Sequence, residues 1–198
     1  MEIVELILDE ENEDQVVGIE AISIVESGAI ESDFIALADQ EIKLAKVDEE
    51  KKILMGAALI PNKPIFRKRN DTMFYVYFSE DTVRKASELF FMNGNQNNAT
   101  LEHQMSINNL SVVESWIVES TTMDKSAKYG LNVPVGTWMI SMKVNNDEVW
   151  NDYVKSGKVK GFSIEGYFAD KAKIKESKED MSEIESQKKL EEILSLLK

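Results

Sequence analysis

Two residues in this chain, a single histidine and a serine on a predicted strand, could together carry out hydrolytic chemistry. The 198 residues include one histidine, His103, and no cysteine. An imidazole that acts as a general base near neutral pH must therefore belong to His103. The absence of cysteine excludes disulfides, a cysteine nucleophile and thiolate zinc sites. A histidine-based metal site would lack partners, although carboxylates alone could bind a hard cation.

Residues 158–168 are predicted to form the β-strand that carries Ser163, because β-forming side chains recur there between glycines. Phe162 and Ile164 would point to one face of this strand, and Ser163 and Glu165 to the other. A small hydroxyl on a rigid strand, beside a glycine, is suited to a nucleophile. Taken alone, the segment favours a half-buried strand whose polar side chains are only solvated, by roughly ten to one over a strand that carries a nucleophile.

If His103 and Ser163 meet in the fold, they can act as a base and a nucleophile. The imidazole would take the serine proton, the alkoxide would attack a carbonyl carbon, and the imidazolium would protonate the leaving amine. A carboxylate usually orients such a histidine, and the candidates near it in the sequence are Glu114 and Glu119. Their separation is odd, so they lie on opposite faces of a predicted strand, and only one of them can enter a site.

Composition and charge exclude several classes of partner. The chain is 43% hydrophobic and 30% charged, as is usual for globular proteins, and its net charge is -13. This charge argues against nucleic acids and against an anionic membrane surface. The N-terminus has no basic region followed by an apolar run, and no segment approaches the length of a membrane span. A cytoplasmic location is therefore expected.

The pattern of apolar residues predicts a β-rich α+β domain. A helix is expected between an N-cap at Ser79 and a C-cap at Gly94, and a shorter helix within residues 145–157. The basic cluster 67–69 is expected in a solvated loop. Such a domain would be a barrel or a strongly bent sheet with helices packed outside. The predicted strands cover residues 2–8, 42–47, 53–60, 73–78, 111–119, 137–144 and 158–168, with short extended pieces in 16–38.

The composition changes after Phe168, which predicts a domain of residues 1–168 and a separate tail of residues 169–198. Residues 169–188 are rich in charged residues and serine and are typical of a solvated linker. Residues 181–197 could form an amphipathic helix, which would need a partner to be stable. That partner could be the domain itself, a second copy of the chain or another protein.

Several long segments, in the same order along the chain, resemble the prohead maturation proteases of tailed phages, and above all the XkdF-like serine protease branch of phages and prophages. The similarity extends from about Gly18 to Phe168. The segments that carry it are residues 18–25, 61–66, 97–104, 113–118, 136–139, 146–150 and 159–168.

This resemblance implies a fold shared with herpesvirus assemblins, a β-barrel wrapped by short helices, in which Ser163 is the nucleophile and His103 the base. Glu114 is the first choice for the third residue, with Glu119 or Asp147 as the alternatives. No cofactor is implied. Dimerisation through a helix would fit the likeness to assemblins.

The resemblance also implies a function, a serine endopeptidase of capsid maturation. Its substrates would be the scaffold, the N-terminal part of the major capsid protein and the protease itself, cleaved inside the assembling prohead in the bacterial host cytoplasm. The alternative is a non-catalytic assembly or scaffold-binding protein that keeps the same fold. A metal-dependent hydrolase is disfavoured by the single histidine and the absence of cysteine.

Overall fold

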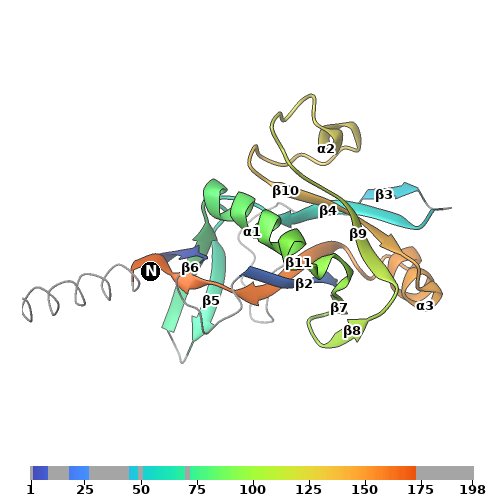
Figure 1. The fold of residues 1–198 in the computed structure, drawn as a ribbon, viewed down its shortest axis with the longest axis horizontal. Coiled ribbons are helices and arrows are strands. Elements are labelled where there is room, and N and C mark those ends of the chain that lie inside the picture. The colour runs from blue at the N-terminus through green and yellow to red at the C-terminus, as the bar shows by residue number, and fades with distance from the viewer. Residues whose placement is uncertain (1, 9–17, 27–44, 49–50, 70–71, 173–198) are drawn as a thin grey trace, which may run out of the picture.

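The computed structural model describes residues 2–8, 18–26, 45–48, 51–69 and 72–172, which form three four-stranded sheets (Figure 1). The first sheet, in the order β12-β1-β6-β5, contains β1 (Glu2–Ile7), β5 (Ile65–Arg69), β6 (Thr72–Phe78) and β12 (Ala169–Asp170). The second, in the order β3-β4-β10-β9, contains β3 (Ala45–Asp48), β4 (Ile53–Leu59), β9 (Leu110–Ile117) and β10 (Trp138–Val144). The third, in the order β11-β2-β7-β8, contains β2 (Gly18–Val25), β7 (Ala99–Leu101), β8 (Met105–Ile107) and β11 (Gly161–Tyr167).

Short helices connect the strands of these sheets. The longest is α1, which has acidic residues in its first turn, where they favour the positive end of the helix dipole. No helix of the described residues is long and apolar enough to cross a membrane. The helices are α1 (Glu80–Met92), the 3-10 turn η1 (Asn95–Asn97), α2 (Lys125–Lys128), α3 (Asp147–Val149) and the π-helical turn η2 (Trp150–Lys155).

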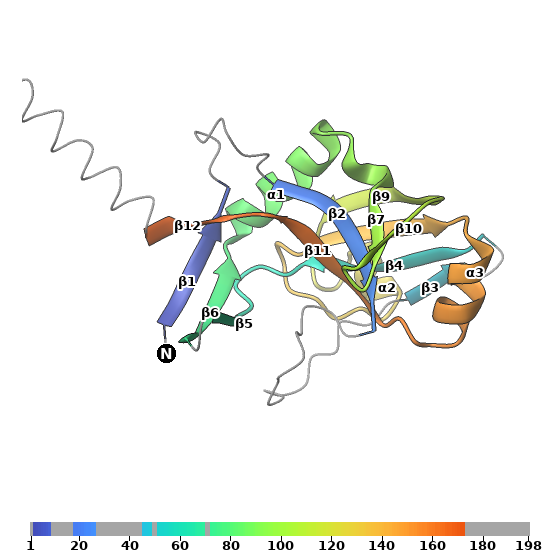
Figure 2. The same cartoon turned by 90° about the horizontal axis from the view of Figure 1, so that it is seen from below.

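Helix α1 and the second and third sheets share one core. Phe90 of α1 packs edge-on against Trp138 of β10, with ring centroids 5.5 Å apart. In the third sheet Ile22, Ile24 and Phe162 belong to the same buried cluster. In Figure 2, β2 and β11 run side by side past α1, and β4 and β10 lie on the other side of the core. Because one face of the third sheet is buried here, its other face is the one on which polar side chains can gather.

A β-bulge bends the pair of β2 and β11 next to this polar face. Glu165 is paired with Ala21, whereas the next residue, Gly166, is paired with Ile19, so Glu20 is the extra residue of β2. Ile19 is buried in the core together with Ile22. The bulge therefore places the side chain of Glu20 on the same face as those of Ala21 and Glu165, because the extra residue interrupts the alternation of the strand.

Gly166 is required at this bulge, and we expect Gly166→Ala to destabilise the fold strongly. An added Cβ would overlap the carbonyl oxygen of Gly18 and lie 2.8 Å from Cα of Ile19, and both are backbone atoms. The expected loss is about 3 kcal/mol or more in the free energy of unfolding, measured by urea denaturation. Gly130→Ala is the control: its φ is +74° but no atom lies within 4 Å of the added Cβ, so it should lose only about 1–2 kcal/mol. Equal losses would contradict the steric argument.

The described residues confirm the β-rich α+β class. They form three hydrogen-bonded sheets rather than one closed ladder, so the predicted assemblin-like barrel is not confirmed. The prediction of a solvated loop for residues 67–69 is wrong, because β5 ends at Arg69 and pairs with β6. This strand is at the edge of its sheet, where basic side chains commonly protect against unwanted pairing.

The predicted division after Phe168 is not tested by the structure, which continues through β12 to residue 172. Ala169 and Asp170 pair with Ile7 and Leu6 of β1, so the first two residues of the predicted linker belong to a sheet. The predicted helix of residues 181–197 lies outside the described residues.

Candidate active site

Hydroxyl side chains form a row across the polar face of the third sheet. Ser163 of β11 is paired with Ser23 of β2, Ser23 with Thr100 of β7, and Thr100 with Ser106 of β8. Residues paired across neighbouring strands point to the same face, so these four side chains project together. Glu165 lies two residues after Ser163 on β11 and projects from the same face, because side chains alternate along a strand.

A tight turn between β7 and β8 carries His103 to this face. Gln104 N–H donates to the Leu101 carbonyl over 3.0 Å, and the two residues between them, Glu102 and His103, have φ of +52° and +56°. Such turns usually contain asparagine or glycine at these positions, so two non-glycine residues here represent local backbone strain. Strain of this kind persists only where surrounding contacts hold the backbone, and it is concentrated at functional sites.

Two hydrogen bonds that the turn donates to β2 hold its strained backbone. Glu102 N–H donates to the Ile24 carbonyl over 3.1 Å, and His103 N–H donates to Oγ of Ser23 over 3.0 Å. Ser23 is fully buried. The second residue of the hydroxyl row is therefore the anchor of the His103 backbone.

The His103 ring contacts the carboxylate of Glu165. Nδ1 of His103 lies 3.1 Å from Oε1 of Glu165, and the same oxygen accepts a hydrogen bond from Oγ1 of Thr100. The exposed fraction of the side chain is 41% for His103 and 29% for Glu165, so this pair is only partly shielded from water. When Nδ1–H donates to the carboxylate, Nε2 carries the lone pair and is free to accept a proton.

Ser163 is buried, with 7% of its surface exposed. It shares its face with Glu165 and lies directly beside Ser23, which holds the His103 backbone. Among the described residues no hydrogen bond joins Ser163 to His103. The arrangement thus places a hydroxyl, an imidazole and a carboxylate on one face, with the carboxylate already on Nδ1.

None of the predicted acids contacts His103 in the described residues. Glu114 lies on β9 in the second sheet and accepts a hydrogen bond from Nζ of Lys125. This ammonium holds the pKa of Glu114 below its usual range. Asp147, at the start of α3, is paired with Lys52, and Glu119 follows the end of β9 on the surface. No hydrogen bond or ion pair in the described residues connects any of these three carboxylates with His103.

The sequence contained a signal for Glu165, which was not among the predicted site residues. Alternation along the strand predicts that Glu165 shares a face with Ser163, whereas the predicted acids Glu114 and Glu119 are those closest to His103 in the sequence. Residues two apart on one strand share a face in any sheet, so the carboxylate that contacts His103 is close in sequence to Ser163 rather than to the histidine. Ser23 and Thr100 had no such signal, because their role depends on how three strands pair.

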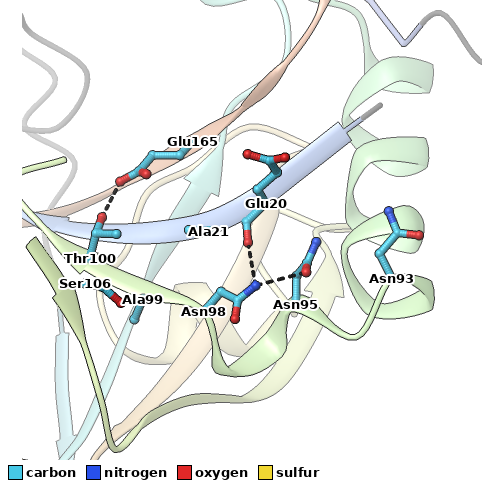
Figure 3. Close-up of a pocket in the computed structure, with 9 residues that line it drawn as sticks. All are labelled: Glu20, Ala21, Asn93, Asn95, Asn98, Ala99, Thr100, Ser106 and Glu165. Carbon is cyan, nitrogen blue, oxygen red and sulfur yellow. Dashed lines mark hydrogen bonds between the residues drawn. The ribbon is translucent and has the colours of Figure 1, made fainter. Parts of the chain in front are cut away.

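An open pocket of about 450 Å³ lies beside the His103–Glu165 pair (Figure 3). Glu165 and Thr100 form one end of its lining, and the residues that follow α1 form the other. Asn98 donates from Nδ2 to the Glu20 carbonyl over 3.1 Å and to Oδ1 of Asn95 over 3.0 Å, which fixes the loop against β2. The lining consists of Glu20, Ala21, Asn93, Asn95, Asn98, Ala99, Thr100, Ser106 and Glu165.

Removing the anchor of the turn should destabilise the protein. In Ser23→Ala the partly buried N–H of His103 loses its acceptor, and a buried donor left unsatisfied costs about 1–3 kcal/mol, so we expect a loss near the lower end of this range. Urea denaturation of the purified chain measures this loss. Ser106→Ala, at the exposed end of the same row, is the matched control and should change stability by less than about 0.5 kcal/mol. If both variants are as stable as the wild type, Ser23 is not the anchor.

Comparisons with known proteins give one result. The model of the family described as "Putative phage serine protease XkdF" matches residues 41–173, more than half of the chain. The matched part contains His103, Ser163 and Glu165. No curated protein and no solved structure matches the chain.

Proposed function

The chain belongs to the family described as "Putative phage serine protease XkdF", and from this premise we propose that it is an endopeptidase that uses Ser163, His103 and Glu165. The observation that carries the proposal is the 3.1 Å contact between Nδ1 of His103 and Oε1 of Glu165, on the face from which Ser163 projects. A carboxylate on Nδ1 orients the ring and leaves Nε2 for the serine, which is the arrangement that activates a serine nucleophile.

In the first half of the reaction, Ser163 is acylated. Nε2 of His103 takes the hydroxyl proton while Oγ forms a bond with the carbonyl carbon of the scissile peptide. The tetrahedral intermediate then collapses, the C–N bond breaks, and the imidazolium gives the proton to the leaving amine. In the second half, His103 takes a proton from a water molecule whose oxygen attacks the acyl carbon. The bond between that carbon and Oγ then breaks, and the imidazolium returns the proton to Ser163.

Glu165 positions the base and stabilises its charged form. It holds the Nδ1–H tautomer in the resting state and faces the positive charge that develops on the imidazolium. Thr100 donates to the same carboxylate oxygen and restricts its rotation. We propose Glu165 for this role in place of Glu114, because Glu114 is engaged by Lys125 in another sheet.

We further propose that the substrates are capsid-assembly proteins of the phage, namely the scaffold, the N-terminal part of the major capsid protein and the protease itself. The family is a phage family, which supports a role during phage growth. Cleavage would take place inside the assembling prohead, in the host cytoplasm, and would clear the interior before DNA is packaged.

Co-expression of the chain with the scaffold and capsid proteins of its phage tests this function. Intact mass spectrometry of the assembled particles would compare the wild type with His103→Ala. We expect the wild type to trim the scaffold and the capsid protein, and the variant to leave both at full length, since loss of the base typically lowers the rate by roughly 10⁴- to 10⁶-fold.

The same experiment separates an enzyme from an assembly protein. Particles that form normally with uncut partners in both samples would show that the chain assists assembly without cleaving. Equal trimming by the wild type and by His103→Ala would assign the cleavage to another protease.

A further inference from the structure

The pocket beside the catalytic residues is built from polar groups without a cation. Its nine lining residues include two carboxylates, Glu20 and Glu165, and three asparagines, but no lysine or arginine. Glu165 already bonds His103 and Thr100. The carboxylate of Glu20, in contrast, has no hydrogen bond or ion pair with any part of the chain that the structure describes. The pocket therefore contains one carboxylate that has no partner among the described residues and could pair with a cationic group.

The bulge in β2 is the reason that Glu20 belongs to this pocket. In a regular strand Glu20 would alternate with Ala21 and point to the opposite, buried face together with Ile22. As the extra residue of the bulge it is instead turned to the face of Ala21 and Glu165. Bulges next to active sites commonly redirect a side chain in this way. Figure 3 shows Glu20 and Glu165 on neighbouring strands above the asparagines.

The asparagine loop supplies further acceptors around the same space. The backbone at Asn95 and Asn98 is fixed against β2, because their Nδ2 groups donate to the carbonyls of Ile19 and Glu20. With Nδ2 committed to a carbonyl, the Oδ1 atom of Asn98 keeps capacity to accept a hydrogen bond. Carboxylate and amide oxygens in a pocket of about 450 Å³ match a side chain that carries several donors and a positive charge.

We propose that this pocket is the subsite that selects an arginine or lysine side chain of the substrate close to the scissile bond, with Glu20 as the specificity-determining residue. The proposal rests on the proposed protease function, because Glu165 lies both at the pocket and on His103. A side chain bound here would lie next to the base, so the adjacent peptide bond would approach Ser163. An acidic substrate side chain would face Glu20 and would be rejected.

A metal ion fits the pocket less well than a basic side chain. Within the described residues no group of three or more histidine, cysteine, aspartate or glutamate side chains could hold a metal. Two carboxylates, one of them committed to His103, leave a divalent ion with too few charged oxygens. An organic cation needs only one free carboxylate and nearby amide acceptors.

Binding to the pocket can be measured without catalysis. The probe is N-acetyl-arginine methylamide, titrated into the ¹⁵N-labelled full chain with Ser163→Ala, and the readout is the side-chain NH₂ signals of Asn95 and Asn98. We expect saturable shifts with the arginine probe and at least roughly tenfold weaker binding of the citrulline analogue, which has the same shape without the charge. Equal shifts with both probes, or none with either, would overturn the proposal.

Charge substitutions at Glu20 provide the matched controls. Glu20→Gln should lower the affinity for the arginine probe by about tenfold, and Glu20→Lys should abolish its binding. Glu148→Gln removes one negative charge from the exposed surface of α3, away from the pocket, and should leave the titration unchanged. If Glu148→Gln weakens binding as much as Glu20→Gln does, the probe responds to net charge and the subsite is absent.

Mapping of the cleavage sites separates this proposal from the proposed function. In co-expression with the capsid proteins, the cut sites of the wild type should share a basic residue at one fixed distance from the scissile bond. Cutting at sites without such a residue would refute the subsite and leave the protease intact. Probe binding without any cutting would refute the protease and leave a pocket for basic side chains.

Discussion

The Ser163→Ala substitution is expected to abolish labelling of the protein by a fluorophosphonate probe. In the wild type, Oγ of Ser163 attacks phosphorus, the P–F bond breaks, fluoride leaves, and the serine proton passes to Nε2 of His103. Only an activated serine reacts at a useful rate. The labelling rate of the variant should therefore be lower than that of the wild type by roughly 10⁴-fold or more, and equal to the background rate of the other serines. Intact mass and peptide mapping measure the labelled fraction and its position.

This measurement requires no substrate and therefore does not depend on the identity of the capsid proteins. The double variant Ser163→Ala with His103→Ala should label no more slowly than Ser163→Ala alone, because residues that act as a unit are not additive. Ser156→Ala, which removes an exposed hydroxyl at the end of η2, outside the pocket, should label like the wild type. Undiminished labelling of Ser163→Ala would show that another residue is the nucleophile.

Glu165→Gln is expected to lower the rate of cleavage by roughly 10³- to 10⁴-fold, whereas Glu114→Gln should change it less than about threefold. The amide keeps the size of Glu165 but loses the charge that faces the imidazolium, and it can present an N–H to Nδ1 and so favour the wrong tautomer. Glu114 contacts Lys125 in another sheet, and loss of an exposed ion pair of this kind costs at most about 1 kcal/mol of stability. Self-cleavage or trimming of the capsid proteins, followed by intact mass, gives both rates.

Two further variants distinguish a positioning role from a structural one. Glu165→Asp keeps the charge on a shorter side chain and should recover part of the rate that Glu165→Gln loses. The free energy of unfolding of Glu165→Gln, measured by urea denaturation, should lie within about 1 kcal/mol of the wild-type value, since the carboxylate is partly exposed. If Glu114→Gln lowers the rate of cleavage and Glu165→Gln does not, Glu114 rather than Glu165 is the carboxylate that positions His103.

Local patterns in the sequence were sufficient for the elements with a clear run or period. The strand that became β6 is predicted from its run of apolar and aromatic side chains. The helix that became α1 is predicted from helical spacing and from the capping position of Ser79. The edge strand β5 is not predicted, because Arg67 and its basic neighbours lack an apolar face. The short strands β7 and β8, of three residues each, are too short to show a period.

The sequence by itself determined the candidates for the base and the nucleophile, because the chain has one histidine and because the segments around His103 and Ser163 resemble one phage family. It also placed Glu165 on the face of Ser163, since alternation along a strand is a local property. Only the tertiary structure decided which carboxylate meets the histidine. That choice depends on the order β11-β2-β7 and on a turn with two positive φ angles that brings His103 back over the sheet. The position of Glu20 at the pocket likewise depends on a bulge: Gly166 permits it, but which residue of β2 becomes the extra one is decided only by the pairing of the two strands.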